Sequence, residues 1–511
     1  MPESAGRSRV SVNLVANGAG SIATSLIQFA IIPVYIRLLG PESYGLVGVQ
    51  TTLQALAQLL DFGVSASINR ELARRTALGA DASSVRDLVR TLELGYGAIG
   101  LVLGAIVFLG APLAERWLQH AQLSSLTIRH SMQVMALLLA AQWPLTFYQG
   151  ALLGLQRHAL YNAVRIGCTA VTAGGAFVVL TRVAQTPVAL FAWQAFMAVV
   201  QVLLLAGATW WCLPRAEGRP RASRASVAGL GSFAVGMTGV TATALLLSQA
   251  DRIVTSRVLP LETFGYYMLG ATLANALLYT FVSPVYASVF PRLSALVAVG
   301  DLPTLQASYR RAWGVMAALA VPAAAVLCLF AYPLILVWTR DPAAAAATAP
   351  IARLLVSGMA LHGLLLIPFG LQMAHGWTRV ALTINTTLCA VALPLVMVLA
   401  RVYGAVGAAA AWPIVNVLFA VATITITHGR FGAETGRRWL VADIAWPAGA
   451  AIAVTALTRS VVPVPASFIG VLAVAAVAWV LTSAALVALS PLLRSNALDL
   501  LARVRGPRRA T

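Results

Sequence analysis

The sequence has 511 residues, of which 59% are hydrophobic and only 10% are charged. A soluble globular chain has about a quarter of its residues charged, so this composition excludes an ordinary water-soluble protein. The net charge of +19 comes from arginine alone, and these arginines stand in short gaps between apolar runs. A nucleic-acid-binding domain gathers its basic residues in one hydrophilic region, so the chain is predicted to lie in a lipid bilayer and not to bind nucleic acid.

Apolar segments long enough to cross a membrane recur along the whole chain. A spanning helix needs about 20 predominantly apolar residues. Such segments are expected at 12–37, 44–66, 90–112, 128–152, 159–181, 187–212, 228–256, 264–289, 312–338, 350–373, 378–401, 404–427, 440–459 and 467–490. The first is too long for the hydrophobic region of a cleaved signal peptide. The sequence therefore predicts an all-α membrane protein with about 14 transmembrane helices.

The distribution of arginine predicts the orientation. With both termini inside, 25 of the 35 arginines fall on the cytoplasmic side and 10 on the other side. Short cytoplasmic loops carry an excess of basic residues, so we expect a multi-pass protein of the plasma membrane with both termini in the cytoplasm. The basic tail from 494 to 511 is expected to lie on anionic lipid.

An internal repeat predicts how the helices are grouped. A shift of 220 residues lays the segment 37–45 over 257–265, with four identical residues and two similar ones. Six predicted helices separate the two copies and both copies start on the same side, so the repeat is parallel. We expect two pseudo-symmetric six-helix lobes plus two C-terminal helices. The expected boundaries are 1–213 for the N-terminal lobe, 214–227 for a cytoplasmic linker, 228–428 for the C-terminal lobe, 429–493 for the last two helices and 494–511 for the tail.

Polar side chains at membrane depth are candidate binding residues, because each is costly there unless it faces a cavity or a partner. The first helix carries a polar stripe at helical spacing, made of Asn13, Asn17, Ser21, Thr24, Ser25 and Gln28. The helix at 228–256 carries a similar stripe that ends at Ser248 and Gln249. The two stripes predict two walls of one water-accessible cavity, and hydrogen bonding between helices is the alternative.

Charged residues at membrane depth narrow the chemistry. They are Asp61, expected deep in the second helix, Glu93 one turn inside the third, Arg165, Asp251 and Arg252, with Arg70 at the cytoplasmic end of the second helix. An arginine in a cavity suits a phosphate or diphosphate, because its planar group donates two parallel hydrogen bonds. A carboxylate there suits a coupling proton or sodium ion. The alternative for each is local pairing, as between Asp251 and Arg252 or Arg257, or extension of the side chain to the membrane surface.

Catalytic motifs are absent from the sequence. The six histidines and four cysteines have no metal-ligand spacing, and there is no GxSxG, P-loop or GxGxxG motif. No expected outside loop is long enough to hold a site for sugar chemistry. Neither an enzymatic activity, nor a cofactor, nor a metal is therefore expected.

Several motifs carry a resemblance to a known family. They are Ile32–Gly45, Asp61-Phe62-Gly63, Arg70-Glu71-Leu72-Ala73, Gln249-Ala250-Asp251-Arg252, Val289–Ser294 and Tyr403–Ala409. With them, most of residues 10–430 resembles the bacterial polysaccharide-biosynthesis flippases, the O-antigen or capsule repeat-unit translocases. These belong to the same superfamily as the multidrug and toxic-compound extrusion transporters.

The resemblance implies a function and a set of site residues. Each six-helix lobe would line a cationic, hydrated cavity, and an oligosaccharide linked through diphosphate to undecaprenol would pass from the cytoplasmic to the outer leaflet of the bacterial inner membrane by alternating access. Arginines would grip the diphosphate. The candidate substrate-binding residues are Asn17, Gln28, Asp61, Arg70, Arg165, Gln249, Asp251 and Arg252. Polysaccharide polymerase or assembly proteins are implied as further partners.

Three other functions stay open at this point. A cation-coupled drug or metabolite exporter would share the fold, but the first helix lacks the acidic cluster of the drug exporters. A membrane-embedded sugar-transfer enzyme would need a catalytic constellation. A scaffold for polysaccharide assembly is compatible with the flippase. The motifs name neither the glycan nor the coupling ion.

Overall fold

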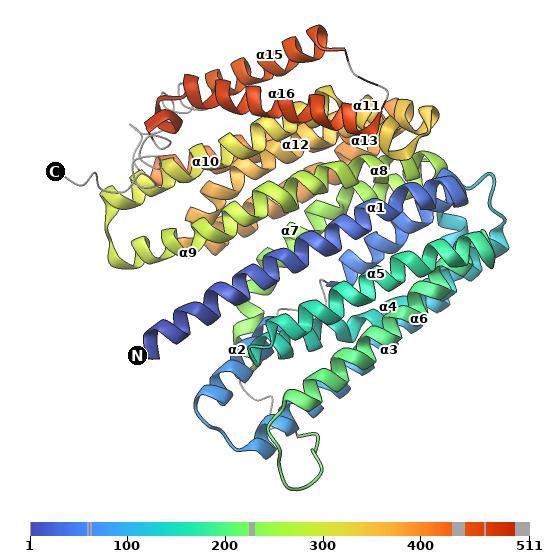
Figure 1. Ribbon diagram of the computed structural model, residues 1–511, viewed down its shortest axis with the longest axis vertical. Helices are drawn as coiled ribbons and strands as arrows, with labels where there is room; N and C mark the ends of the chain where they lie inside the picture. Colours follow the sequence, from blue (N-terminus) through green and yellow to red (C-terminus); the bar gives the residue numbers. More distant parts are fainter. Residues whose placement is uncertain are drawn as a thin grey trace. The chain divides into compact units, whose positions relative to one another are not determined.

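The computed structural model describes residues 2–58, 61, 64–223, 230–431, 445–463, 465 and 467–495, and Figure 1 shows its helices. They are α1 (Pro2–Gln58), α2 (Val64–Ala77), α3 (Ala82–Trp117), α4 (Ser125–Gly154), α5 (His158–Arg182), α6 (Pro187–Cys212), α7 (Leu230–Val258), α8 (Leu261–Leu277), the π-helix η3 (Leu278–Val282), α9 (Ser283–Val299), α10 (Leu302–Leu329), α11 (Ala331–Thr339), α12 (Pro342–Ala374), α13 (Thr378–Phe431), α15 (Trp446–Val461) and α16 (Phe468–Leu489). The expectation of an all-α protein is confirmed.

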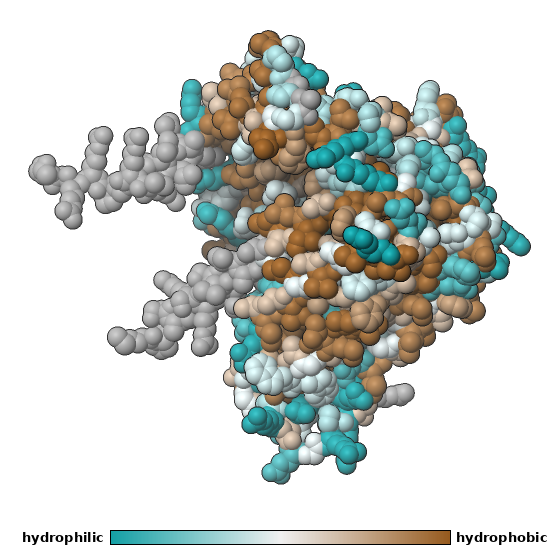
Figure 2. Space-filling view, turned by 45° about the vertical axis from the view of Figure 1, so that its right-hand side comes forward, coloured by the Kyte–Doolittle hydropathy of each residue, from teal (hydrophilic) through white to brown (hydrophobic). Residues whose placement is uncertain are grey.

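The outward faces of these helices are apolar. Within the described residues, nine helical stretches are long and apolar enough to cross a membrane. On α3, for example, Leu101, Leu109 and Leu113 are each about 70% exposed or more. Hydrophobic residues cover much of the face drawn in Figure 2. A surface of this kind is stable in lipid and not in water, so the chain is a multi-pass membrane protein.

Side-chain caps explain where several helices begin. Asp81, Ser124, Asp301 and Asp341 each accept a hydrogen bond from a backbone N–H in the first turn of the helix that follows. These N–H groups have no partner inside the helix, so the cap satisfies them. Hydrogen bonds from the side chain and from the backbone N–H of Thr304 also lower the pKa of the Asp301 carboxyl at the start of α10.

Two helices are broken at a glycine. Gly40 in α1 has φ 81° and Gly404 in α13 has φ 63°, and an L side chain rarely adopts such a backbone conformation. Each long helix therefore consists of two helical segments that meet at the glycine. The break at Gly40 falls in the turn predicted between 12–37 and 44–66, and the break at Gly404 falls at the first residue of the predicted segment 404–427.

Two expectations about charged residues were wrong. Asp61 does not lie deep in a helix, because α1 ends at Gln58 and α2 begins at Val64, and Asp61 itself has 3₁₀ and not α-helical geometry. Glu93 lies about three turns inside α3 and not one, because this helix begins at Ala82. Both errors arise because the helix bounds were predicted from average hydropathy. This average does not show the break between α1 and α2 near Asp61, and it does not include the polar first turns of α3 before Glu93.

The chain divides into two compact units, and the first consists of residues 1–245 with 260–265. Helix α4 packs against α2, α3 and α6, and α5 packs against α1 and α6. Phe147 and Leu152 of α4, Leu88 of α3 and Leu72 of α2 are fully buried in the core between these helices. The helices that pack around this core contain Arg165, Glu93 and Glu71, whose contacts are described below.

The second unit consists of residues 246–259 and 266–511. Its central helix is α12, which packs against α9, α10, α11 and α13. The C-terminal helices α15 and α16 pack against each other and against α10, and α16 also contacts α11 (Figure 1). Thr455 and Thr482 form a buried hydrogen bond between α15 and α16.

Candidate functional site

Arg165, one of the predicted site residues, forms a hydrogen bond with a polar residue of a neighbouring helix. It lies half-buried on α5, and its Nη2 donates a hydrogen bond of 2.6 Å to the hydroxyl of Thr24 on α1. Its guanidinium carbon is 6.0 Å from the centre of the Tyr161 ring. Thr24, which the polar stripe of the first helix includes, is 3% exposed. The structure thus joins the stripe to an arginine on a neighbouring helix.

The amide residues of α1 have different surroundings. Gln28 is exposed, and the side chain of Asn17 lies outside the described residues. Further along, Gln54 donates to the side-chain oxygen of Gln142 on α4. Hydrogen bonding between helices, the alternative raised for the polar stripe, therefore applies to Thr24 of the stripe, which accepts from Arg165 on α5, whereas Gln28 is exposed. Gln54, which lies beyond the stripe, forms a bond of the same kind.

Asp61 forms a polar cluster with α3. The Tyr96 hydroxyl donates to its Oδ1 at 2.5 Å, and the Ser65 hydroxyl donates to its Oδ2 at 2.7 Å. Both carboxylate oxygens therefore have hydroxyl partners and no arginine is among them. Arg70, which stands on α2, is exposed. The structure does not bring Asp61 and Arg70 into contact.

Glu93 forms a second polar cluster in the same unit. Its Oε1 accepts from the Tyr148 hydroxyl and from the Trp210 indole at 3.1 Å, and its Oε2 lies 2.8 Å from Nη1 of Arg90. These partners come from α3, α4 and α6, so one carboxylate joins three helices. Because all its oxygens are engaged, Glu93 is a structural residue in this conformation.

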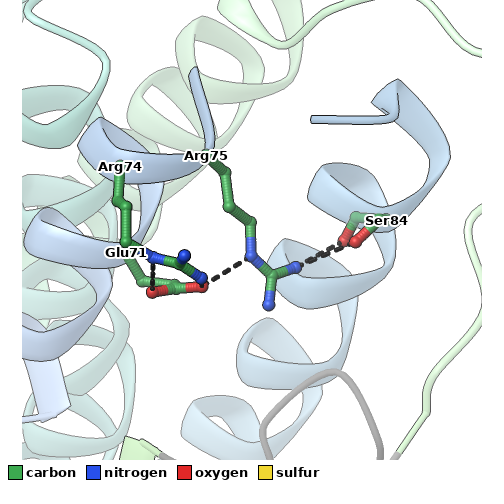
Figure 3. A network of polar contacts seen from close by, with 4 residues as sticks. All are labelled: Glu71, Arg74, Arg75 and Ser84. Carbon is green, nitrogen blue, oxygen red and sulfur yellow. Dashed lines mark hydrogen bonds and ion pairs between the residues drawn. The ribbon is translucent and has the colours of Figure 1, made fainter. Parts of the chain in front are cut away.

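A third cluster stands on α2, outside the candidate spans, and Figure 3 shows it. Glu71 accepts hydrogen bonds from Arg74 and Arg75, and Arg75 reaches on to Ser84 at the start of α3. The bonds from Arg74 and then Arg75 lower the pKa of the Glu71 carboxyl to about 2. Part of the Arg70-Glu71-Leu72-Ala73 motif is thus explained by the connection between α2 and α3.

In the second unit, the QADR motif stands on the last turns of α7. Nη1 of Arg252 donates to Oε1 of Gln249 at 3.1 Å, and the Tyr267 hydroxyl of α8 donates to Oδ2 of Asp251. The Oδ1 atom of Asp251 is buried without a hydrogen-bond partner. Asp251 and Arg252 do not form an ion pair, so the proposed local pairing of these neighbours is not observed.

The ion pairs of the described residues leave two of the membrane arginines without a carboxylate. Four ion pairs are present in this part of the chain, and neither Arg165 nor Arg252 takes part in any of them. Each instead donates to a neutral oxygen. A guanidinium in such surroundings can still bind an anion through its other N–H groups. No group of three His, Cys, Asp or Glu side chains in the described ranges could hold a metal ion.

Sequence reasoning missed the aromatic partners of the carboxylates. Tyr96, the partner of Asp61, lies 35 residues away from it along the chain. Tyr148 and Trp210 come from distant segments, and no local pattern identifies them. His362, a histidine inside the apolar run 350–373, was also passed over because it has no ligand spacing.

Comparison with solved structures identifies the fold of the protein. The lipid II flippase MurJ in its inward closed conformation matches with a TM-score of 0.67 at 12% identity, over 96% of this chain and 100% of that one. An inward-facing multidrug resistance MATE family transporter of the MOP superfamily matches with a TM-score of 0.65 at 13% identity, over 80% and 95% of the two chains. The chain therefore has the fold of the MOP superfamily transporters.

The family follows from the sequence itself. The model of the polysaccharide biosynthesis protein family matches residues 11–297, which is more than half of the chain. The chain belongs to this family, which confirms the resemblance found in its motifs. A search of curated proteins found no significant match.

Proposed function

We propose that this protein is a flippase for a lipid-linked oligosaccharide. Its substrate would be joined through diphosphate to undecaprenol and would move by alternating access from the cytoplasmic to the outer leaflet of the bacterial inner membrane. The family and the fold support translocation in polysaccharide biosynthesis. The proposed activity moves the substrate without changing it chemically, so glycosyl transfer by the purified protein alone would contradict it.

The proposal rests chiefly on the surroundings of Arg165. This arginine lies about two turns inside a candidate membrane span, His158–Arg182, is half-buried, and has a hydroxyl and an aromatic ring as its neighbours instead of a carboxylate. A charge at membrane depth is costly unless it serves a pathway or has a partner. A diphosphate would supply the missing negative charge and accept two parallel hydrogen bonds. In the second unit, Arg252 is also half-buried and donates to an amide oxygen, that of Gln249, and it takes part in none of the ion pairs of the described residues.

A topology of fourteen spans accompanies the proposal. It treats α1 and α13 as two spans each, divided at Gly40 and Gly404, and takes the helical stretches Leu261–Val299 and Leu302–Thr339 as one span each. The single spans are then α3, α4, α5, α6, α7, α12, α15 and α16. This even number keeps both termini in the cytoplasm, as the arginine distribution favours. The two six-helix lobes and their boundaries at 213 and 228 stay predictions.

A deletion strain complemented with variants tests the proposal. In the strain without this gene we expect lipid-linked oligosaccharide to accumulate in the cytoplasmic leaflet and surface polymer to disappear. The wild-type gene should restore the polymer, whereas Arg165→Ala and Arg252→Ala should not, at equal protein levels. Arg165→Lys should restore it in part, because an ammonium keeps the charge but lacks the planar fork.

The controls separate binding from folding and from other functions. Arg182→Ala, at the exposed end of α5, should leave the surface polymer unchanged. An unchanged polymer in both the Arg165 and Arg252 variants would contradict the diphosphate clamp. If deletion left the lipid-linked pool unchanged and caused sensitivity to small toxic compounds, the exporter of the same fold would be the better account.

A further inference from the structure

A hydrogen bond between α12 and α13 fixes the state of a membrane histidine. Nδ1 of His362 lies 3.2 Å from the side-chain oxygen of Asn416, and the amide nitrogen of Asn416 donates to the Trp412 carbonyl at 2.9 Å. A carbonyl only accepts, so the amide of Asn416 is oriented with its oxygen toward the ring. Nδ1 of His362 therefore carries the hydrogen, and Nε2 is left with a free electron pair.

A close contact between the two helices holds this arrangement in place. Gly358 stands one turn before His362, and a Cβ atom there would lie 2.4 Å from the Trp412 ring and 2.8 Å from the Pro413 nitrogen. The helices thus approach within backbone contact at this point. As a result the His362 ring lies with its centre 5.6 Å from that of Trp412 and 6.3 Å from that of Phe419.

These neighbours suit both protonation states of the ring. The Asn416 oxygen accepts from Nδ1–H whether or not Nε2 is protonated, so the hydrogen bond survives a change of charge. The face of a Trp ring attracts a cation within about 6 Å, and the Trp412 ring lies within this range. Asn416 is 2% exposed, whereas His362 is only half-buried. The imidazole can therefore gain a proton without losing its anchor.

No charged side chain in the described residues contacts the ring. On α12 itself the charged or titratable groups are Arg353, the N-cap residue Asp341 and His375 at the C-terminal end. The helices packed against α12 contribute Arg292 of α9, Arg310 and Arg311 of α10, the N-cap residue Asp301 of α10, Arg340 after α11, and Arg379, Arg401 and Arg430 of α13. Helix α7 contributes Leu247 to the cluster that contains Phe419, and its Asp251 and Arg252 are bonded to Tyr267 and Gln249. A proton at His362 would thus be an uncompensated charge.

We infer that His362 is a proton-binding site of the second unit and that the coupling ion of transport is a proton. The neutral imidazole takes up one proton at Nε2 from water to give the imidazolium, and it releases the same proton when the charge becomes unfavourable. The free energy of a charged imidazole at membrane depth is higher in a conformation that excludes water than in one that hydrates the ring. Protonation of His362 would therefore favour the conformation in which the ring is hydrated. The coupling role rests on the proposed flippase function, whereas the proton site itself does not.

The first experiment measures the proton site without transport. In lipid bilayers, the ¹⁵N spectrum of histidine-labelled protein should contain a ring signal that changes on acidification and that is missing in His362→Asn. The shorter amide of this variant can still donate from the position of Nδ1 to Asn416, so the helix contact is kept. His375→Asn, which changes a ring beside Trp377, is the matched control and should leave that signal in place.

The second experiment measures coupling in proteoliposomes that contain undecaprenyl-diphosphate-linked oligosaccharide. For one proton per substrate, each imposed pH unit shifts the distribution between leaflets about tenfold. We expect this response in the wild type and in His375→Asn, and a loss of the response, with equilibration retained, in His362→Asn and His362→Gln. A ring that does not titrate, or an undiminished pH response in His362→Asn, would overturn the inference. A titrating ring in a protein that moves no substrate would support the proton site and contradict the proposed function.

Discussion

Gly45 and Gly265, which occupy equivalent positions in the two copies of the sequence repeat, make the same contact with each other's segment. A Cβ atom at Gly45 would lie 2.3 Å from the carbonyl oxygen of Leu261, and one at Gly265 would lie 2.2 Å from that of Pro41. Pro41 and Leu261 are also equivalent in the repeat. All four residues belong to the first unit. The repeated motif thus packs on itself reciprocally, as in a two-fold related contact.

This contact predicts that Gly45→Ala and Gly265→Ala destabilise the protein to a similar degree. Each added methyl group meets a backbone oxygen that no side-chain rotation can move, so the two segments must separate. Overpacking of this kind costs about 1–3 kcal/mol, which thermal unfolding in detergent would show. Gly97→Ala on α3, where a Cβ meets nothing within 4 Å, is the control and should be neutral or slightly stabilising. Equal stability of all three variants would contradict the reciprocal contact.

Glu42 is expected to be essential for the stability of the same region. Its carboxylate is 3% exposed and accepts backbone hydrogen bonds from Ala121, Gln122 and Leu123 at 2.7, 2.8 and 3.2 Å. In Glu42→Gln one oxygen becomes an NH₂ group that faces N–H donors. Hydrogen bonds to charged groups contribute about 1.5–3 kcal/mol, so we expect a loss of this size in chemical unfolding. Glu217→Gln, an exposed change, should have no measurable effect.

The Glu71 cluster predicts a dependence of stability on pH. The folded-state pKa of about 2 lies below the ordinary value of 4.5, because Arg74 and Arg75 bind the carboxylate. The contribution of Glu71 is therefore complete above about pH 4.5 and is lost as the pH falls toward 2. The difference in unfolding temperature between wild type and Glu71→Gln should be constant from pH 7 to 5 and shrink below that. A difference that grew on acidification would contradict this assignment.

The two arginines of this cluster should not be equal. The side chain of Arg74 is 58% exposed and that of Arg75 is 16% exposed. Exposed ion pairs contribute little because solvent screens them, and Arg75 also bonds Ser84. Arg75→Gln should therefore lower the unfolding temperature more than Arg74→Gln. The reverse order would show that the connection to α3 does not contribute.

A double-mutant cycle tests the link between Asp61 and α3. Tyr96 donates to one oxygen of this carboxylate and Ser65 to the other. We expect Asp61→Asn and Tyr96→Phe to be strongly non-additive, with a coupling energy of about 1–3 kcal/mol. The pair Ser65→Ala and Tyr96→Phe, whose hydroxyls donate to different oxygens of the carboxylate, should couple less. Additive behaviour of Asp61 and Tyr96 would mean that the hydrogen bond is not formed in the membrane.

Local signals predicted much of the fold. Apolar runs of about 20 residues located the membrane helices because lipid requires the backbone to satisfy its own hydrogen bonds. Gly40 and Gly404 end their segments for a local conformational reason, so the turns were also predictable. Asp61 was misplaced because a window of hydropathy averages across the short break before α2.

The candidate site was predictable only in part, because its contacts join distant segments. The position of Arg165 in an apolar run identified it as unusual, but nothing in the sequence shows that Thr24 is its partner. His362 and Asn416 are 54 residues apart, and Glu42 binds backbone amides about 80 residues away. Backbone donors carry no sequence signal at all. Such contacts depend on helix packing, which one sequence does not specify locally.

The most direct test of the flippase is translocation by the purified protein in liposomes. Undecaprenyl-diphosphate-linked oligosaccharide would be placed in both leaflets, and a glycosidase added outside would report the fraction that becomes accessible with time. We predict that wild-type protein makes the inner pool accessible within minutes and that Arg165→Ala leaves about half of the substrate protected, as in protein-free liposomes. Continued protection of the inner pool in the presence of folded wild-type protein, with and without a pH gradient, would contradict the account.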